Sequence, residues 1–139
     1  MPKVLYHAVV LDETSRQKLI KYFKSIIPEG WSIVTHHMTI SFGGDINLNI
    51  QPTFEKNKGL NIPLMVNDYA LNDKVIAVGV SGFPSENDKP HITIAVNKIA
   101  GGKPVMSNQL TDWKPLKRPF MIVGKPTEVT VGDNILKPV

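Results

Sequence analysis

The chain has 139 residues, of which 42% are hydrophobic and 20% are charged. This length and balance predict one domain, residues 1–139, that buries roughly two thirds of its unfolded surface around a single core. Cysteine is absent, which excludes disulfides, thiolate metal sites, iron–sulfur clusters and a cysteine nucleophile. Four histidines remain as the groups best suited to proton transfer near neutral pH.

The charge balance favours anionic ligands. Sixteen basic residues against twelve acidic ones give a formal charge of +4. The basic residues are scattered, so a small phosphorylated ligand fits the balance as well as a nucleic-acid polymer does. The longest apolar runs are far shorter than the roughly 20 residues of a membrane span, and the first ten residues lack a signal-peptide core. We therefore expect a cytoplasmic protein with no membrane partner and no obligate protein partner.

The first forty residues predict a β-α-β unit. Residues 4–11 are β-rich and bounded by polar residues, which indicates a strand. A helix follows, because Asp12 or Thr14 can cap it and apolar residues recur at helical spacing until Pro28. Residues 31–42 alternate between polar and apolar and stop at two glycines, which is typical of a strand with one buried face.

The rest of the chain predicts mostly strands. Residues 45–62 are rich in asparagine and broken by proline and glycine, so we expect a loop with one short irregular strand. The further predicted elements are strands over 64–71, 75–81 and 91–97, a short helix within 104–113, and one or two closing strands over 120–131. The sum is an α+β domain with largely antiparallel sheet and about two helices.

One motif occurs twice. His37-Met38-Thr39-Ile40 is echoed by His91-Ile92-Thr93-Ile94, 54 positions later (91 − 37). Strand alternation places each histidine on the same face as its threonine, while the intervening apolar residues point to the other face. A single His-x-Thr motif in a strand is usually structural, but two copies favour a function. If the two segments pack as a pseudo-symmetric pair, both histidines and both threonines meet at one cleft.

This set of side chains suits phosphodiester cleavage. One imidazole can take a proton from the attacking oxygen while the other gives a proton to the leaving oxygen. The two threonine hydroxyls can donate to the phosphate oxygens, where charge develops. The scheme requires no metal and no other cofactor. A zinc site built from the four histidines is disfavoured, because alternation sends His36 and His37 to opposite faces.

The segments HHMTISFGG, PHITIAVN and GGKPVMSNQLTDW resemble the two-histidine phosphoesterase superfamily, whose LigT-like fold carries two His-x-Thr/Ser-apolar motifs. The resemblance spans most of the chain, and it is closest to the compact branch related to RNA-repair proteins of the "Swiss Army knife" type. It implies a bilobal fold with a central cleft. The chain departs from that pattern in one respect: the spacing of 54 residues between the motifs is short for LigT-like enzymes, which, with the loop-like stretch 45–62, indicates a reduced lobe. The resemblance also implies that His37 and His91 are catalytic and that Thr39 and Thr93 bind phosphate.

The resemblance further implies a phosphoric diester hydrolase that acts at 2′,3′-cyclic phosphates or at 2′–5′ and cyclic oligonucleotide linkages. RNA ends, cyclic nucleotides and small oligonucleotides are therefore the expected substrates, in RNA repair or in the degradation of nucleotide signals, including those of host defence against phage. An alternative is a non-catalytic nucleotide-binding or RNA-binding module that uses the same cleft. One sequence does not assign the roles of acid and base to the two histidines.

Several other side chains are candidates for substrate contact. Tyr6 lies on a strand expected beside the histidine strands and can bind phosphate or stack on a base, and Ser41 continues the face of His37. His7 and His36 are interpreted as structural. Trp113 is interpreted as a packing residue, and Ser107 as part of a helical turn that needs no ligand.

Overall fold

In the computed structural model, residues 3–130 are described, and they form seven β-strands, two α-helices and two short 3-10 helices. The strands are β1 (Val4–Leu11), β2 (Ser32–Ile33), β3 (His37–Ser41), β4 (Ile62–Leu71), β5 (Val75–Ser81), β6 (His91–Val96) and β7 (Lys114–Thr130). The helices are α1 (Glu13–Phe23), η1 (Lys24–Ile26), α2 (Gln51–Asn57) and η2 (Pro104–Gln109). None of these helices has the length and hydrophobicity that a membrane span requires.

Six of the strands close into an antiparallel barrel. Their order is β6-β3-β1-β7-β4-β5, and β5 pairs again with β6 to complete the ring, while β2 extends along β6 beside β3. The α+β class and the antiparallel sheet are therefore confirmed. The two β-rich halves of the chain share one continuous sheet, because β5 pairs with both β4 and β6 and so joins them.

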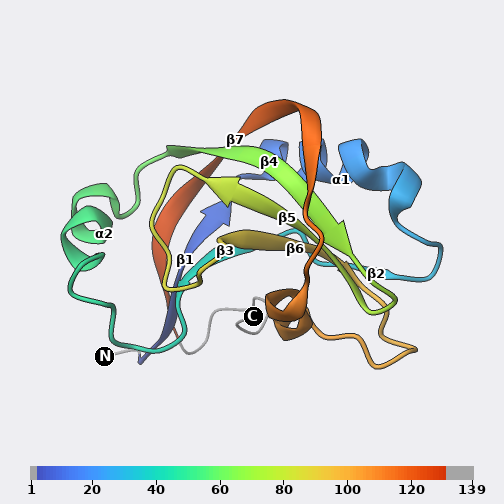
Figure 1. Cartoon of the computed structure of the whole chain (residues 1–139). Helices are drawn as coiled ribbons and strands as arrows, with labels where there is room; N and C mark the ends of the chain where they lie inside the picture. The colour runs from blue at the N-terminus through green and yellow to red at the C-terminus, as the bar shows by residue number, and fades with distance from the viewer. Residues whose placement is uncertain (1–2, 131–139) are drawn as a thin grey trace.

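The main core fills the barrel from the apolar faces of its strands. Met38 and Ile40 of β3 and Ile92 and Ile94 of β6 are fully buried in this core. Helix α1 adds Leu19 and other apolar side chains to the same core. Figure 1 shows α1 on one side of the barrel and η2 on another, beside β6. The faces of β3 and β6 that carry the histidines are thus left for a separate site.

The N-terminal prediction was accurate, with one exception. Strand β1 has the predicted bounds, and the Asp12 side chain caps α1 by accepting from the backbone N–H of Ser15 at 2.7 Å. The strand predicted over 31–42 is interrupted between β2 and β3, where Thr35 adopts a left-handed backbone with φ of 42°. A threonine rarely adopts this conformation, so the interruption is a specific local distortion.

The prediction for residues 45–62 was wrong. This segment contains helix α2, which begins next to Pro52 and buries Phe54 completely. Proline is well tolerated in the first turn of a helix, and one large apolar side chain is enough to dock so short an element. The last strand is also longer than predicted. Strand β7 starts at Lys114, pairs with β4 over its first part and turns to pair with β1 over its second part.

Candidate active site

The two His-x-Thr motifs lie on neighbouring antiparallel strands. Met38 of β3 pairs with Ile92 of β6, so the register places His37 beside Thr93 and Thr39 beside His91. All four side chains are buried on the face opposite the main core. His37 and His91 are therefore diagonal neighbours across the two strands, and diagonal neighbours in a sheet are roughly 7–8 Å apart. The predicted packing of the two motif segments side by side is therefore confirmed.

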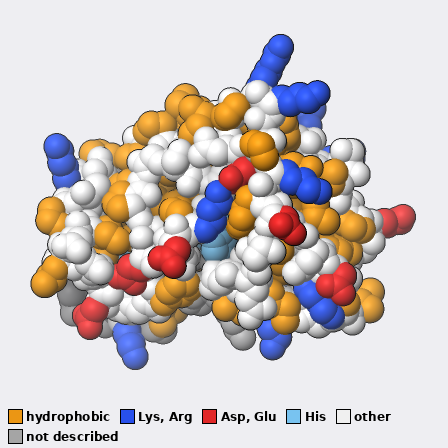
Figure 2. Space-filling model, viewed as in Figure 1, with side chains coloured by type: hydrophobic (Ala, Val, Ile, Leu, Met, Phe, Trp, Pro, Cys, Tyr) orange, Lys and Arg blue, Asp and Glu red, His pale blue; other side chains and the backbone are white. Residues whose placement is uncertain are grey.

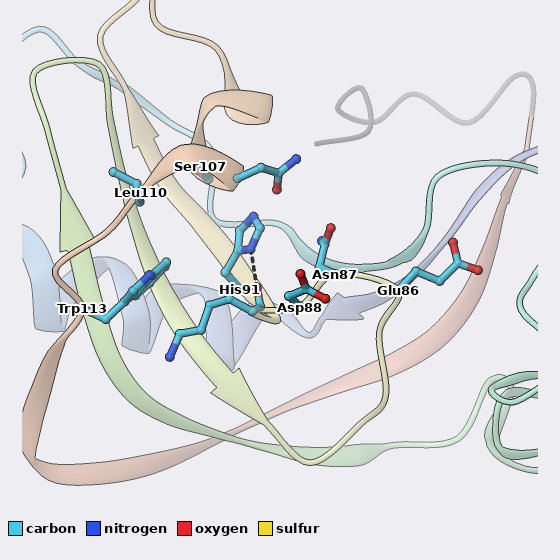
Figure 3. A pocket seen from close by; sticks show the side chains of 9 residues that line it. Glu86, Asn87, Asp88, His91, Ser107, Leu110 and Trp113 are labelled. Atoms are coloured by element: carbon cyan, nitrogen blue, oxygen red, sulfur yellow. Dashed lines mark hydrogen bonds between the residues drawn. The ribbon is translucent and has the colours of Figure 1, made fainter.

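The ring of His91 has a defined orientation. Its Nδ1 lies 2.8 Å from the backbone carbonyl of Lys89, as the dashed line in Figure 3 shows. A carbonyl only accepts, so Nδ1 carries the proton and Nε2 of the neutral ring is bare. This Nε2 is buried and has no hydrogen-bond partner among residues 3–130. Burial lowers the pKa of His91, and the bond to the Lys89 carbonyl opposes part of that decrease.

The ring of His37 is held by a different partner. Its Nδ1 lies 2.9 Å from Nδ1 of His36, and the ring centroid of Tyr6 is 5.3 Å away. Its Nε2 is also buried and unpartnered within the described part of the chain. Burial, then the neighbouring His36 and His91, lower the pKa of His37 to about 3. His37 is therefore neutral at physiological pH.

The two threonines differ in their partners. The hydroxyl of Thr93 lies 2.8 Å from the hydroxyl of Ser107 and 3.4 Å from the Pro104 carbonyl, which ties β6 to η2. The buried hydroxyl of Thr39 finds no partner in the region that the structure describes. Thr39 is thus the motif hydroxyl whose hydrogen-bonding capacity is unused within residues 3–130.

Buried polar atoms without partners gather around this face. Within residues 3–130 they are Nε2 of His37, Oγ1 of Thr39, Oδ1 of Asp68, Nδ2 of Asn87 and Nε2 of His91. Three belong to the two motifs. Asn87 lines the same pocket as His91. Asp68 of β4 and His91 of β6 lie on either side of Gly79 in β5, which pairs with both of them in the sheet. Each such atom costs about 1–3 kcal/mol, so their concentration at one place indicates a site built for a polar ligand.

A pocket of about 300 Å³ opens beside His91. It is lined by Glu86, Asn87, Asp88, Lys89, His91, Ser107, Asn108, Leu110 and Trp113, from the loop before β6 and from η2 and the residues after it. Figure 3 shows His91 in the middle of this set, between Trp113 and Asn87. In Figure 2 a histidine is visible in a hollow near the centre of the molecule, between acidic and basic side chains.

Lys89, which lines this pocket, forms an ion pair with Asp68 that the sequence did not predict. Nζ of Lys89 is 2.6 Å from Oδ2 of Asp68 and 4.8 Å from the ring centre of Trp113. The space for it comes from Gly79, where a Cβ atom would lie 1.9 Å from Oδ1 of Asp68 and 2.7 Å from Cε of Lys89. A glycine inside a strand that allows close approach is the signal that could have indicated this pair.

The predicted substrate contacts of Tyr6 and Ser41 have different surroundings. Tyr6 is buried with its ring against His37, so it lies at the site. Ser41 is buried, and its hydroxyl lies 2.7 Å from Nδ1 of His7. The ring of His7 also packs edge-on against Phe54, with 4.9 Å between centroids, in agreement with the structural role predicted for it.

The predicted direction of the His36 side chain was wrong. Regular alternation would send its side chain to the opposite face from His37, yet the two rings are hydrogen-bonded. His36 precedes β3 and follows the left-handed Thr35, so strand alternation does not govern its direction.

Ser107 and Trp113 lie closer to the candidate site than the sequence indicated. The Ser107 hydroxyl is hydrogen-bonded to the hydroxyl of Thr93, and both Ser107 and Trp113 line the pocket beside His91.

Comparison with known proteins adds no assignment. Searches of protein-family models and of curated proteins found no match to this chain. Among the described residues, no three histidine, aspartate or glutamate side chains are grouped so that they could hold a metal ion. The interpretation of the site therefore rests on its own geometry.

Proposed function

We propose that the protein is a metal-independent phosphodiesterase of the two-histidine type, with a LigT-like fold. The observation that carries the proposal is the crossed arrangement of the two motifs. His37 and His91 each hold Nδ1 in a hydrogen bond, and each has a buried Nε2, on the same face of the sheet, that has no partner in the part of the chain that the structure describes. Two imidazoles presented in this way suit a reaction that removes one proton and supplies another.

The proposed reaction is the hydrolysis of a phosphodiester, at a 2′,3′-cyclic phosphate or at a 2′–5′ or cyclic oligonucleotide linkage. One imidazole takes a proton from a water molecule as its oxygen bonds to phosphorus. The other imidazole protonates the ribose oxygen as the P–O bond to it breaks, so one water is consumed and protons balance. The hydroxyl of Thr39 donates to a phosphate oxygen. Thr93 does the same when its hydroxyl accepts from Ser107 and turns its own proton from the Pro104 carbonyl to the phosphate.

The pocket beside His91 favours a small substrate. Its volume of about 300 Å³ is at the lower end of the range for small-molecule sites. Glu86 and Asp88 lie on its wall and repel a second phosphate, whereas the indole of Trp113 offers a surface for a nucleobase. Lysine and arginine side chains are also separated by acidic ones in Figure 2, so that face lacks a continuous basic track for a long RNA. A terminal or single nucleotide is the best fit.

The proposal is tested by measuring turnover of a panel of substrates in excess EDTA. The panel contains the four 2′,3′-cyclic mononucleotides, 2′–5′ oligoadenylate and cyclic dinucleotides. We expect cleavage in EDTA and a loss of at least about 10²-fold in both His37→Ala and His91→Ala, because each removes a proton-transfer group. His7→Gln is the matched control, since His7 is a buried histidine whose ring contacts Ser41 and Phe54 rather than the two motifs.

Two results would contradict the proposed metal-independent phosphodiesterase activity. Loss of activity in EDTA would show that a metal is required. Tight binding of an unaltered nucleotide, with no product by chromatography, would instead assign the nucleotide-binding module that uses the same cleft.

A further inference from the structure

The hydrogen bond between His36 and His37 constrains where the protons are. The two Nδ1 atoms are 2.9 Å apart, and in a hydrogen bond between two neutral rings one nitrogen must donate and the other must accept. If Nδ1 of His37 donates, its Nε2 is bare. If Nδ1 of His37 accepts, its Nε2 carries the proton and can donate toward the site.

His91 decides between these two arrangements. Its Nδ1 donates to the Lys89 carbonyl, so its Nε2 is bare and ready to accept a proton. Two bare Nε2 atoms would provide two bases and no acid in the resting site. A site that both removes and supplies a proton needs the opposite state at His37. That state requires Nδ1 of His36 to donate to Nδ1 of His37.

We propose that His36 is a positioning residue whose Nδ1–H bond to His37 fixes the proton on Nε2 of His37, making His37 the general acid and His91 the general base. This inference rests on the proposed phosphodiesterase function. It assigns different roles to two motifs that are alike in sequence, and the difference comes from what each Nδ1 contacts: a backbone carbonyl in one case and a second imidazole in the other.

The pair also forms a short proton relay. A neutral imidazole that loses its Nε2 proton becomes an anion unless a proton reaches Nδ1 in the same event. His36 supplies that proton, so the bond from Nδ1 of His36 breaks as the bond to Nδ1 of His37 forms. In the same event a water molecule protonates Nε2 of His36, and the hydroxide it leaves is neutralised by the proton that His91 took from the attacking water and returns to solvent through the pocket beside it. Water afterwards reprotonates Nε2 of His37 as Nδ1 of His37 gives its proton back to Nδ1 of His36 and Nε2 of His36 releases its own to water, so protons balance, no ring becomes an anion and the resting tautomers are restored.

His36 has access to solvent for this step. It lines a second cavity of about 450 Å³, separate from the pocket beside His91. The charged side chains that line this cavity with it are Asp12, Lys125 and Glu128. Burial, then the positive charge of Arg16 on α1, lower the pKa of His36. The ring is thereby kept neutral, as a relay that donates from Nδ1 and is reprotonated at Nε2 requires.

The tautomers are tested directly by NMR, without any substrate. Two-bond ¹H–¹⁵N correlation spectra of the histidine rings at pH 7 distinguish a protonated nitrogen from a bare one. We expect His37 to carry its proton on Nε2 and His91 on Nδ1. A proton on Nδ1 of His37 overturns the assignment, whether or not the protein cleaves phosphodiesters.

Two substitutions at His36 form a matched pair for the same measurement. His36→Asn keeps an amide donor and is expected to leave the His37 proton on Nε2, whereas His36→Asp offers only acceptors and is expected to move it to Nδ1. A His37 tautomer that is the same in both variants overturns the positioning role. Folding of each variant is checked by circular dichroism.

The roles of acid and base are tested by changing the leaving group. A 2′,3′-cyclic nucleotide releases an alkoxide that needs an acid, whereas thymidine 5′-(4-nitrophenyl phosphate) releases a stable phenolate that does not. We expect His91→Ala to lose activity on both substrates, and His37→Ala to lose about 10²–10⁴-fold on the cyclic nucleotide but less than about tenfold on the nitrophenyl diester. The reverse pattern would overturn the assignment, and no turnover of either substrate by the unaltered protein would reject the proposed function while the NMR result still decides the tautomers.

Discussion

Met38 of β3 lies directly opposite Ile92 of β6, and this single register pair fixes the geometry of the candidate site. It places the histidine of each motif beside the threonine of the other, on a face from which the main core is excluded. A shift of the register by one residue would turn one motif into the barrel interior.

The two motif threonines should respond differently to the same substitution. Thr39→Val removes a buried hydroxyl without a partner in residues 3–130, so we expect stability to stay constant or rise by up to about 1 kcal/mol. Thr93→Val leaves Ser107 without its partner and should cost about 1–3 kcal/mol. Urea denaturation measures both. Equal losses of stability in the two variants would contradict the difference in hydrogen bonding, and both variants should cleave phosphodiesters more slowly.

Acid should destabilise the protein through His37. In the unfolded chain a histidine titrates near pH 6.5, whereas the pKa of folded His37 is about 3. Between these values the unfolded chain binds more protons, so stability rises with pH across this window and is lost as pH falls from 6.5 toward 3. The expected slope is roughly 1.4 kcal/mol per pH unit for this one group.

His37→Gln provides the comparison, because glutamine cannot titrate. Urea denaturation of both proteins between pH 4 and pH 7 should give a shallower pH dependence for the variant. Parallel curves for the two proteins would show that the folded protein does not hold His37 in its neutral form.

Trp113 should affect substrate binding more than the chemical step. Its ring lines the pocket beside His91, and stacking on a nucleobase is worth about 1–3 kcal/mol. We expect Trp113→Ala to raise KM for cyclic nucleotides at least about fivefold with little change in kcat, and Trp113→Phe to restore most of the loss. A cyclic ribose phosphate without a base serves as the control substrate, and an equal effect on it would argue against stacking.

Gly79→Ala should disturb the ion pair between Lys89 and Asp68. The added Cβ would lie 1.9 Å from Oδ1 of Asp68 and 2.7 Å from Cε of Lys89, so the pair must move. Overpacking of this kind typically costs about 1–3 kcal/mol. Gly43→Ala is the matched control, because a Cβ at that position would meet no atom within 4 Å. Thermal unfolding compares the two, and similar melting temperatures would show that the space at Gly79 is not required.

The sequence predicted the parts of the site that depend on local alternation. The neighbours of each motif histidine within its own strand follow from period-two geometry, and so does the separation of Thr39 from Met38. The pairing of each strand with its neighbours in the sheet cannot be predicted from this alternation. The closure of β5 onto β6 and the packing of Phe54 under α2 are contacts between distant segments, and neither leaves a periodic signal.

His36 shows why one local rule failed. Its direction is set by the backbone of Thr35, which adopts a conformation that a threonine seldom takes. The residue preferences of the sequence do not predict a left-handed backbone at a threonine. Asp68 and Lys89 escaped prediction for a related reason, since their pairing depends on a missing side chain at Gly79, on a third strand.

The Nδ1 atoms of His37 and His91 have different partners, and this makes the candidate site asymmetric. Two identical motifs related by a two-fold axis would treat the two ester oxygens of a 2′,3′-cyclic phosphate alike. Here one ring is fixed by the Lys89 carbonyl and the other by His36, and the pocket that can hold a base adjoins His91 and not His37. On the proposed function, a cyclic nucleotide bound here would present one particular oxygen to each ring. On the proposed function, the enzyme is regioselective and yields a single phosphate isomer, either 2′ or 3′.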